Sequence, residues 1–356
     1  MASDGFHEKP FDEGTITKLE LFELYSREWL PVFLAKSPSP WKSVHIFDFF
    51  AGPGSDCDGV PGSPLRILEQ FKSYAHLPGW DGVSVHAHFF DEDQEKVKTL
   101  NSILTSIGLA PKLNLDIQCI SFVDALVRYE SVLADPGEAK LLFIDQFGVS
   151  QVSDDVFRRI VSYPVTDFFF FISSSILHRF HGHPSLERKI EKPGDYFDVH
   201  RMVLESYRRQ LPVAGEYFLA PFSIKKGSNI YGVIFGSAHP KGIDKFLEVA
   251  WSKDKINGEA DFDINRDGIS QDQPFLAFEE FRPTKVTHFE RELEAELLAG
   301  RFRDERELAR FCFLRGMRRQ SAAGVLKLLK DRGEISASFR VPSISQAPPR
   351  RLSRKR

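Results

Sequence analysis

A glycine-rich turn with acids around it follows the first long apolar run of the chain. Residues 45–64 read HIFDFFAGPGSDCDGVPGSP, in which Asp48, Phe50, Gly52 and Gly54 form the pattern D-x-F-x-G-x-G. Glycines at the end of a strand let the backbone approach a bound molecule closely, and parallel sheets bind ligands at the carboxyl ends of their strands. The pattern therefore indicates a ligand-binding turn, with a purely structural turn as the alternative.

The charge of this turn distinguishes between ligands. A dinucleotide-binding turn has a third glycine and leaves a helix N-terminus free for the pyrophosphate. Here the third glycine is missing, and Asp56 and Asp58 add negative charge to the loop. S-adenosylmethionine carries a sulfonium cation and no phosphate, so an acidic loop suits it. The sequence predicts that this turn binds S-adenosylmethionine.

Two further acids follow the next strand-like runs. Asp91 comes directly after VSVHAHFF, where an acid in nucleotide-binding sheets commonly accepts hydrogen bonds from ribose hydroxyls. Asp124 follows the third run and is a candidate for holding the adenine amino group. The alternative for both is helix capping, which we expect of Asp93. The wide spacing between the first and second acids indicates an insertion around GSDCDGVPGSP, which we expect to close over the cofactor. The predicted cofactor-binding residues are Asp48, Phe50, Gly52, Gly54, Asp91 and Asp124.

The fourth strand-like run ends in FIDQFG, and this stretch is the candidate acceptor site. Enzymes that methylate the exocyclic amines of bases often carry D/N-P-P-Y/F/W there. Asp145, Gln146, Phe147 and Gly148 keep an acid and an aromatic residue but lack both prolines. A carboxylate among so many apolar residues needs a partner, so packing alone does not explain Asp145. We predict that Asp145 and Phe147 are catalytic residues that position the acceptor.

Metal and disulfide chemistry are not indicated. Cys57, Cys119 and Cys312 lie far apart without a CxxC spacing. Three histidines at 178, 181 and 183 follow the fifth strand-like run, but their spacing matches no standard set of metal ligands and no carboxylate lies among them. We interpret this segment as a basic loop and predict no metal site.

The elements that must position these residues alternate along the chain. Apolar residues recur at helical spacing between residues 16 and 33, which predicts an amphipathic helix. Strand-like runs at 44–50, 83–90, 115–122, 139–145 and 166–175 alternate with helix-like segments, and their apolar character indicates strands buried on both faces. Residues 216–226 and 230–238 then read as an antiparallel hairpin. This is the arrangement of class I methyltransferases, an α/β, Rossmann-like fold whose mostly parallel sheet ends in a hairpin.

A charged helical region follows the sheet domain. Three helix-like segments between 287 and 333 and a strand-like ISASFRVP predict a winged helix-turn-helix module. Its arginines include Arg315, Arg318 and Arg319, which we predict contact nucleic-acid phosphates; a solvated, salt-bridged surface is the alternative. The expected organisation is a helical lead-in (1–43), a methyltransferase-like domain (44–285), the winged-helix module (286–342) and a disordered basic tail (343–356).

Composition places the chain among cytoplasmic proteins. It has 356 residues and a formal net charge of -3, and its longest apolar run is far shorter than the roughly 20 residues that span a bilayer. The N-terminus MASDGFHEKPFDEG is acidic where a signal peptide is basic. We expect a soluble protein without a membrane partner.

The ordered segments together resemble the three-Cys-motif partner (TcmP) family. The resemblance runs nearly end to end and includes TKLELFELYSREWL, DFFAGPGSDCDGVPGSPL, LLFIDQFGVS, TDFFFFISSSILHRF and PFSIKKGSNIYGVIFGSAHPKGIDKFLEVAW. It implies a class I methyltransferase fold, tolerance of the D-Q-F-G form, and a three-Cys-motif partner protein that resembles radical S-adenosylmethionine enzymes.

Two functions are consistent with these observations. The first is S-adenosylmethionine-dependent methyl transfer to a nucleic acid, DNA or RNA, or to a product of the partner enzyme. The second is a non-catalytic adaptor that keeps the fold, binds nucleic acid and recruits the three-Cys-motif partner. The cofactor turn favours the enzyme, and the incomplete acceptor motif favours the adaptor; the fold alone does not decide between them.

Overall fold

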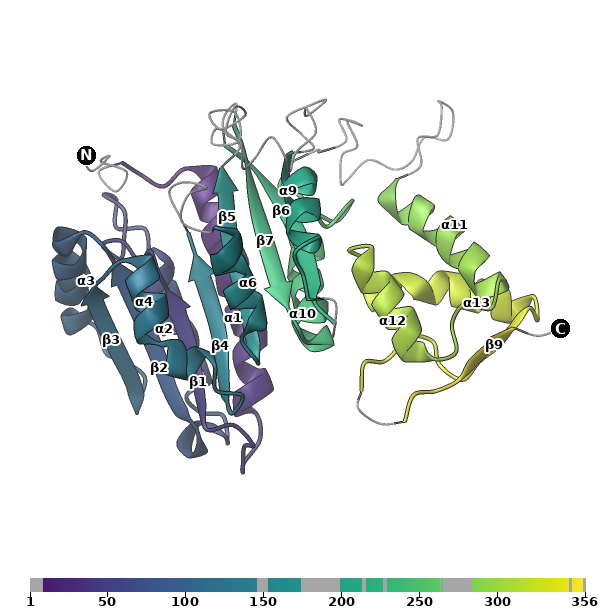
Figure 1. The fold of residues 1–356 in the computed structure, drawn as a ribbon, viewed down its shortest axis with the longest axis horizontal. Coiled ribbons are helices and arrows are strands. Elements are labelled where there is room, and N and C mark those ends of the chain that lie inside the picture. The colour runs from purple at the N-terminus through teal and green to yellow at the C-terminus, as the bar shows by residue number, and fades with distance from the viewer. Residues whose placement is uncertain are drawn as a thin grey trace. The chain divides into compact units, whose positions relative to one another are not determined.

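The computed structural model describes residues 9–145, 153–173, 199–212, 216–226, 229–262, 264, 284–345 and 348–354 (Figure 1). The chain divides into two compact units, Met1–His239 and Pro240–Arg356, so α10 (Pro240–Lys253) groups with the C-terminal helices. The predicted domain bounds place this helix in the sheet domain instead. Each unit is described by itself below.

The described part of the first unit is built on one seven-stranded sheet in the order β3-β2-β1-β4-β5-β7-β6. Neighbouring strands among β1 to β5 pair in parallel, whereas β7 runs antiparallel to both β5 and β6. The predicted mostly parallel sheet that ends in an antiparallel hairpin is therefore confirmed. The strands are β1 (Ser43–Asp48), β2 (Ser84–Asp91), β3 (Leu113–Cys119), β4 (Glu138–Ile144), β5 (Thr166–Ser173), β6 (Phe218–Lys226) and β7 (Asn229–Ser237).

The strand order identifies the edge where a ligand can bind. From β1 the chain proceeds outward to β2 and β3, then returns to β4 on the other side of β1. The carboxyl ends of β1 and β4 therefore flank the point where the order reverses, which is where open α/β sheets bind ligands. The glycine-rich turn follows β1 and the D-Q-F-G segment follows β4, so both predicted motifs start at this edge.

Helices cover both faces of the sheet. Phe47, Leu142 and Phe168 belong to a buried core with residues of α4, α5, α6 and α9, and Figure 1 shows α4 and α6 in front of the sheet. Successive strand residues point to opposite faces, so Phe143 points the other way. It stacks on Phe22 of α1 with ring centroids 4.0 Å apart. The helices of this unit are α1 (Glu13–Leu34), α2 (Ser63–Tyr74), η2 (Trp80–Gly82), α3 (Gln94–Ser106), α4 (Phe122–Arg128), α5 (Glu130–Leu133), α6 (Asp154–Ser162) and α9 (Val199–Arg208).

The first helix, α1, is attached to the sheet by polar as well as apolar contacts. The Asp12 side chain caps it by accepting from the Thr15 N–H at 2.8 Å. Further along, the Tyr25 hydroxyl donates to Asp167 Oδ2 at 2.7 Å, and both groups are buried. Burial raises the pKa of Asp167 to about 6. The predicted N-terminal helix is confirmed, and it packs on β4 and β5. Among the described residues, no helix combines the length and apolar character needed to cross a bilayer.

The second unit contains helices and a small two-stranded sheet. Apart from α10, these are α11 (Lys285–Leu298), α12 (Glu305–Leu314), η4 (Arg319–Ala322), α13 (Ala323–Asp331), β8 (Ile335–Ala337) and β9 (Leu352–Arg354). The strands β8 and β9 pair antiparallel. A winged helix remains a prediction for this arrangement.

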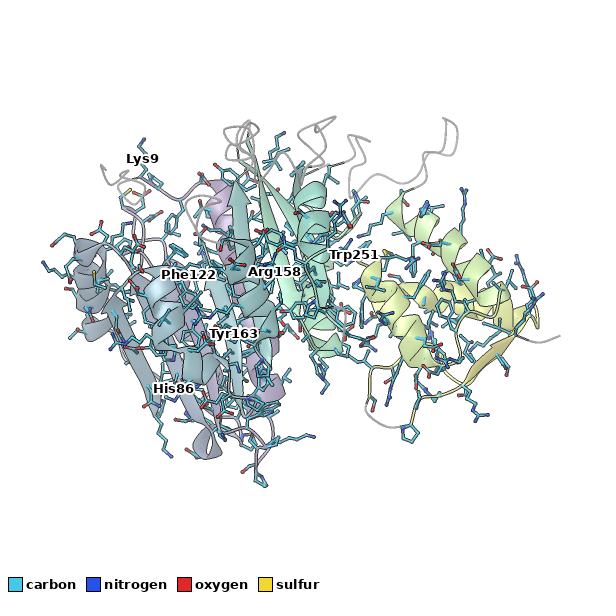
Figure 2. The ribbon with its side chains drawn as sticks, viewed as in Figure 1. Lys9, His86, Phe122, Arg158, Tyr163 and Trp251 are labelled. Carbon is cyan, nitrogen blue, oxygen red and sulfur yellow. The ribbon has the colours of Figure 1, made fainter. Side chains whose placement is uncertain are left out.

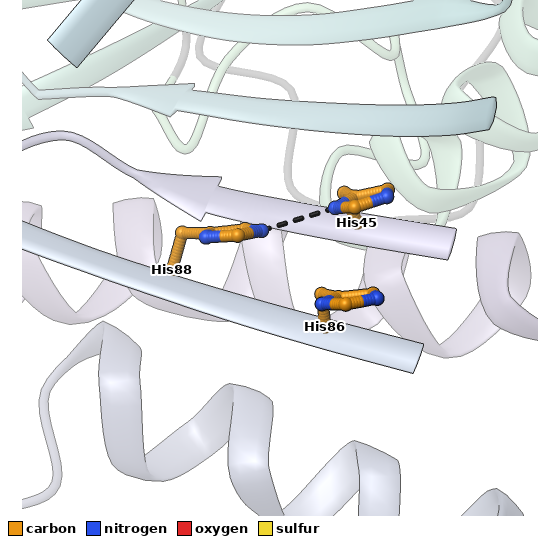
Figure 3. A group of neighbouring side chains, drawn as sticks. All are labelled: His45, His86 and His88. Carbon is orange, nitrogen blue, oxygen red and sulfur yellow. Dashed lines mark hydrogen bonds between the residues drawn. The ribbon is translucent and has the colours of Figure 1, made fainter. Parts of the chain in front are cut away.

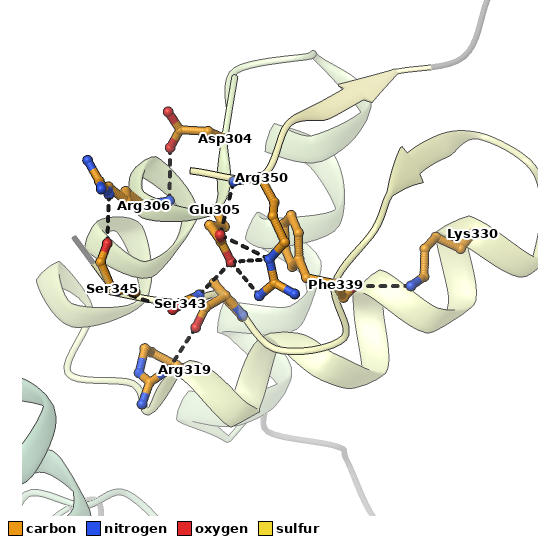
Figure 4. Close-up of polar contacts among 10 residues, drawn as sticks. Asp304, Glu305, Arg306, Arg319, Lys330, Phe339, Ser343, Ser345 and Arg350 are labelled. Atoms are coloured by element: carbon orange, nitrogen blue, oxygen red, sulfur yellow. Dashed lines mark hydrogen bonds and ion pairs between the residues drawn. The ribbon is translucent and has the colours of Figure 1, made fainter. Parts of the chain in front are cut away.

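Residues 348–354 belong to the tail that the sequence predicts to be disordered, and the structure gives them contacts with the rest of their unit. Besides the pairing of β9 with β8, the buried Glu305 carboxylate holds this segment (Figure 4). It accepts from the Arg350 N–H at 3.0 Å and from Arg350 Nη2 at 2.6 Å, and on its other side from the Ser343 N–H at 2.9 Å. The lack of apolar periodicity in the sequence gave no sign of these contacts, because a three-residue strand and one ion pair leave no periodic pattern.

Replacing Glu305 with Gln should loosen the tail. The amide keeps the shape but loses the charge that Arg350 pairs with, so we expect the free energy of unfolding to fall by about 2 kcal/mol. Limited proteolysis should then cut earlier near residue 350. The same change at Glu307, which pairs with the exposed Arg303, should cost no more than about 0.5 kcal/mol. Equal effects of the two substitutions would contradict this account of the tail.

Candidate functional site

The turn after β1 is bound to the end of β2. Gly52 and Gly54 have φ angles of 62° and 97°, in the left-handed region that favours glycine. The Ala51 N–H donates to the Phe90 carbonyl at 2.8 Å, and the Gly52 N–H donates to Asp91 Oδ2 at 3.0 Å. Asp91 thus holds the turn beside the carboxyl end of its own strand, so two predicted cofactor residues, Gly52 and Asp91, are in direct contact.

Gly54 has a packing role as well. A Cβ atom at this position would lie 2.9 Å from Leu100 Cδ1 of α3, closer than side chains approach one another. The Gly62 N–H also donates to the Gly54 carbonyl at 2.8 Å, which closes the loop between them. The left-handed φ of 97° and the closeness of Leu100 therefore both favour glycine here, whether or not a ligand is bound.

The inserted loop between Gly54 and Gly62 is organised by Asp56. This side chain is 6% exposed and accepts the backbone N–H groups of Phe11 at 2.7 Å and Val60 at 2.8 Å. Its carboxylate closes the loop and attaches it to the segment before α1. Asp58 is exposed. The sequence predicted that both acids give the loop a negative charge that suits a cation. The contacts of Asp56 give it a structural role, because its carboxylate accepts backbone N–H groups that hold the loop closed.

Asp48 is the most unusual group at this edge. It is 0% exposed; its Oδ1 accepts from the Phe50 N–H at 3.1 Å, and its Oδ2 has no hydrogen-bond partner among the described residues. Burial raises the pKa of Asp48 to about 7 against the Ser63 hydroxyl and the Phe50 N–H, which donate toward this carboxylate, and the charges of Asp145 and Asp91 raise it further. A buried carboxyl with an unpartnered oxygen is costly unless a ligand group satisfies it.

Asp145, directly after β4, is paired with a lysine of the first helix. The Lys18 ammonium of α1 forms an ion pair with Asp145 Oδ2, and its Nζ lies 5.2 Å from the centroid of the Phe171 ring. Only 13% of the Lys18 side chain is exposed. Sequence reasoning missed Lys18, although one signal was available. Lys18 lies four residues before Phe22 and seven before Tyr25, so it occupies the buried stripe of the helix.

The remaining predicted residues of the sheet domain pack on α4, lie in α4, or fall outside the described residues. Phe50 packs against Phe122 of α4 with ring centroids 5.7 Å apart. Asp124 is exposed in the first turn of α4; its N–H donates to Ser121 Oγ at 3.1 Å, and the Ser121 hydroxyl donates to Asp124 Oδ2 at 2.6 Å. This is the helix-cap alternative for Asp124. Phe147 and the histidines at 178, 181 and 183 lie outside the described residues.

The three arginines predicted to bind nucleic acid pair with acids of their own unit. Arg319 forms a two-pronged ion pair with Asp244 of α10, with contacts of 2.7 and 2.8 Å. Arg315 pairs with Glu292 and stacks on the Phe311 ring, and Arg318 Nη1 lies 3.6 Å from Glu248. The salt-bridged surface was the alternative for these residues. Nucleic-acid binding by them stays a prediction.

Comparisons with known proteins give weak likenesses only. No protein-family model matches the sequence, and no curated protein is significantly similar to it. Among solved structures, a putative rRNA-methylase from Clostridium thermocellum is 11% identical and covers 64% of this chain and 97% of its own, with a TM-score of 0.33. Trm1 from Pyrococcus horikoshii, solved with S-adenosyl-L-methionine, is 11% identical and covers 67% of this chain and 59% of its own, with a TM-score of 0.39. With scores this low, neither likeness indicates what this chain binds.

The raised pKa of Asp48 makes stability depend on pH. The folded state keeps the proton up to about pH 7, whereas the unfolded chain releases it near the ordinary value of 3.8. The contribution of Asp48 to stability is therefore full below pH 3.8 and is lost as the pH rises toward 7. As the pH rises over this range, the free energy of unfolding of Asp48→Asn should increase relative to that of the wild type by on the order of 4 kcal/mol.

Urea unfolding of both proteins at several pH values between 4 and 8 measures this difference. The exposed Asp58→Asn, which also replaces one acid by its amide, is the matched control. If the difference between Asp48→Asn and the wild type does not change with pH, the buried carboxyl does not titrate as described.

Proposed function

We propose that the first unit binds S-adenosylmethionine at the carboxyl ends of β1 and β2 and transfers its methyl group. The observation that carries this proposal is the buried Asp48 carboxyl, which has one unpartnered oxygen beside a left-handed glycine turn. Asp91 and Asp145 are close enough to raise its pKa. An edge with three carboxyl groups disfavours a pyrophosphate and favours a ligand that carries a positive charge.

The chain offers residues for each part of such a ligand. The glycine turn and Asp48 would line the amino-acid and sulfonium side, and Asp91 would exchange its bond to the Gly52 N–H for the ribose hydroxyls. When bound, S-adenosylmethionine supplies a methyl group already activated by its sulfonium. The protein must therefore mainly align the acceptor and accept its proton.

Asp145 is the residue proposed to align the acceptor. It follows β4, across the switch point from the glycine turn, and Lys18 holds its carboxylate in place. An acceptor amine or hydroxyl would replace the Lys18 ammonium as the hydrogen-bond donor to Asp145. Because Lys18 is a residue of α1, the helix that covers β4 and β5 also contributes to the acceptor side.

The acceptor itself is proposed from the resemblance to the TcmP family. We place the chain beside a three-Cys-motif protein that resembles radical S-adenosylmethionine enzymes, with a product of that partner, DNA or RNA as the methyl acceptor. The ion pairs of Arg315, Arg318 and Arg319 do not favour the adaptor, so the enzyme is the function we propose.

Replacing Gly52 with Ala should abolish cofactor binding. The added methyl group would stand on the turn where the ligand must approach, and the left-handed φ of 62° adds strain. Gly59 is the matched control, because it also has a left-handed φ, 79°, and a Cβ there would meet nothing within 4 Å. Gly59→Ala should bear similar strain and keep binding.

Calorimetry with S-adenosylmethionine and with its demethylated product on the wild type and both variants measures this effect. If the wild type binds neither compound, the proposed function fails. If both glycine variants bind as the wild type does, the site lies elsewhere.

The variant Asp145→Asn should lose transfer while it keeps the cofactor. The amide preserves the shape but cannot take a proton, so we expect turnover to fall by about 10²-fold or more with cofactor affinity within about twofold. Transfer of a labelled methyl group to DNA, to RNA and to the reaction mixture of the three-Cys-motif partner is the measurement. A collapse of affinity with unchanged turnover would reverse the roles of Asp145 and the glycine turn.

A further inference from the structure

Three histidines meet on one face of the sheet, away from the proposed cofactor edge. His45 of β1 pairs in register with His86 of β2, and His88 lies two residues further along β2 (Figure 3). One ring nitrogen from each side chain lies within 4.8 Å of the others. His45 and His88 are buried, and His86 is half-buried. The cluster lies toward the amino ends of the strands, whereas the glycine turn follows their carboxyl ends.

A carboxylate lies behind each of the two buried rings. Asp116 Oδ2 of β3 is 3.1 Å from His88 Nδ1, and Glu138 Oε2 of β4 is 3.3 Å from His45 Nε2. The Tyr129 hydroxyl and the Gln118 amide also donate to the Asp116 carboxylate and hold it beside His88. With its Nδ1 at hydrogen-bond distance from Asp116, the His88 ring directs its Nε2 toward His45.

The nitrogens that face each other are at metal-binding distance. His45 Nδ1 and His88 Nε2 lie 3.0 Å apart and share a hydrogen bond, drawn in Figure 3. Two imidazole nitrogens on one tetrahedral zinc ion lie roughly 3.3 Å apart, given Zn–N bonds of about 2.0–2.1 Å. In the hydrogen bond the two nitrogens point at each other, so both rings must turn before their lone pairs can converge on one ion. Glu138 Oε2 has no hydrogen-bond partner among the described residues. The His45 Nε2 atom lies closer to the Ser43 hydroxyl oxygen, at 2.7 Å. If the His45 proton is on Nε2, it can be donated to Ser43, which leaves Nδ1 free for a metal.

We propose that His45, His86 and His88 form a binding site for a divalent transition metal of the zinc class. His45 Nδ1 and His88 Nε2 are two ligands. The far nitrogen of His88 is oriented by the Asp116 carboxylate, as histidine ligands of zinc commonly are, and that of His45 by the Ser43 hydroxyl. His86 is the third ligand. Its ring is stacked on that of His45 at 4.4 Å and within 9° of parallel, so it must turn about its Cβ–Cγ bond to direct a nitrogen at the ion. The His86 Nε2 atom lies 2.9 Å from Ser84 Oγ, a contact that such a turn would have to replace, and water completes the site.

One nearby cation disfavours metal binding at this site, because its positive charge repels the ion. Lys140 of β4 lies beside His45 on the same face and is 0% exposed. Its ammonium donates to the Asp135 carbonyl at 2.8 Å, and burial lowers its pKa to about 8. The carboxylates of Asp116 and Glu138 offset this charge and the charge of the ion. The site joins β1 to β2 and is independent of methyl transfer.

The test is titration of the chelator-treated full chain with Co²⁺ alone, followed by competition with Zn²⁺. We expect one equivalent of Co²⁺ to bind, with the visible absorption of a tetrahedral site, and Zn²⁺ to displace it. His86→Ala should abolish this absorption, whereas the exposed His76→Ala should leave it unchanged. Asp116→Asn should keep the ligands and weaken binding by about 10–100-fold. Circular dichroism checks that each variant is folded. If His86→Ala does not fold, the result for Asp116→Asn decides the test.

A triple variant, His178→Ala, His181→Ala and His183→Ala, separates this cluster from the other closely spaced histidines and should bind Co²⁺ as the wild type does. The proposal is overturned if the wild type binds no Co²⁺ or if binding is lost only in the triple variant. It is also overturned if binding is unchanged in both His86→Ala and Asp116→Asn. The cluster would then be a hydrogen-bonded polar core without a metal.

Discussion

The first unit depends on the burial of a carboxyl group at the centre of its sheet. Asp48 ends β1 between β2 and β4, with no exposed surface and only one of its two oxygens bonded to the backbone. An isolated charge in such a place costs several kcal/mol, and a protein usually neutralises it or provides a partner. Here the carboxyl takes up a proton more readily than usual. The glycine turn follows directly after it, and the positively charged ligand proposed to bind at this turn would supply the missing partner.

The N-terminal helix connects stability to the acceptor side of this edge. Its aromatic residues Phe22 and Tyr25 contact Phe143 and Phe169 on one face of the sheet, and the Tyr25 hydroxyl satisfies Asp167. The same stripe of α1 brings Lys18 to Asp145. A shift of this helix would therefore disturb both the packing of β4 and β5 and the group proposed to align the acceptor.

The two ends of the central strands have different polar chemistry. The carboxyl ends carry Asp48, Asp91 and Asp145, which favour a cation, whereas His45, His86 and His88 lie earlier along β1 and β2. Burial, followed by the neighbouring imidazoles, lowers the pKa of His45 to about 2, so this ring is uncharged at neutral pH. Apolar residues such as Phe47 and Phe90 lie between the two regions. The sheet thus separates two polar environments that would otherwise compete for the same ions.

The sequence by itself determined the sheet and the edge where its motifs gather. Buried apolar runs such as FDFF and LLFI predict strands covered on both faces, and the glycines at 52 and 54 mark the turn, because these signals are local. Contacts between distant segments were decided only by the tertiary structure. The register of β1 against β2 places His45 beside His86, and the docking of α1 pairs Lys18 with Asp145. Glu305 captures Arg350 across 45 residues. A single sequence shows which residues are polar, but not which polar residues meet, because that depends on strand register and helix docking.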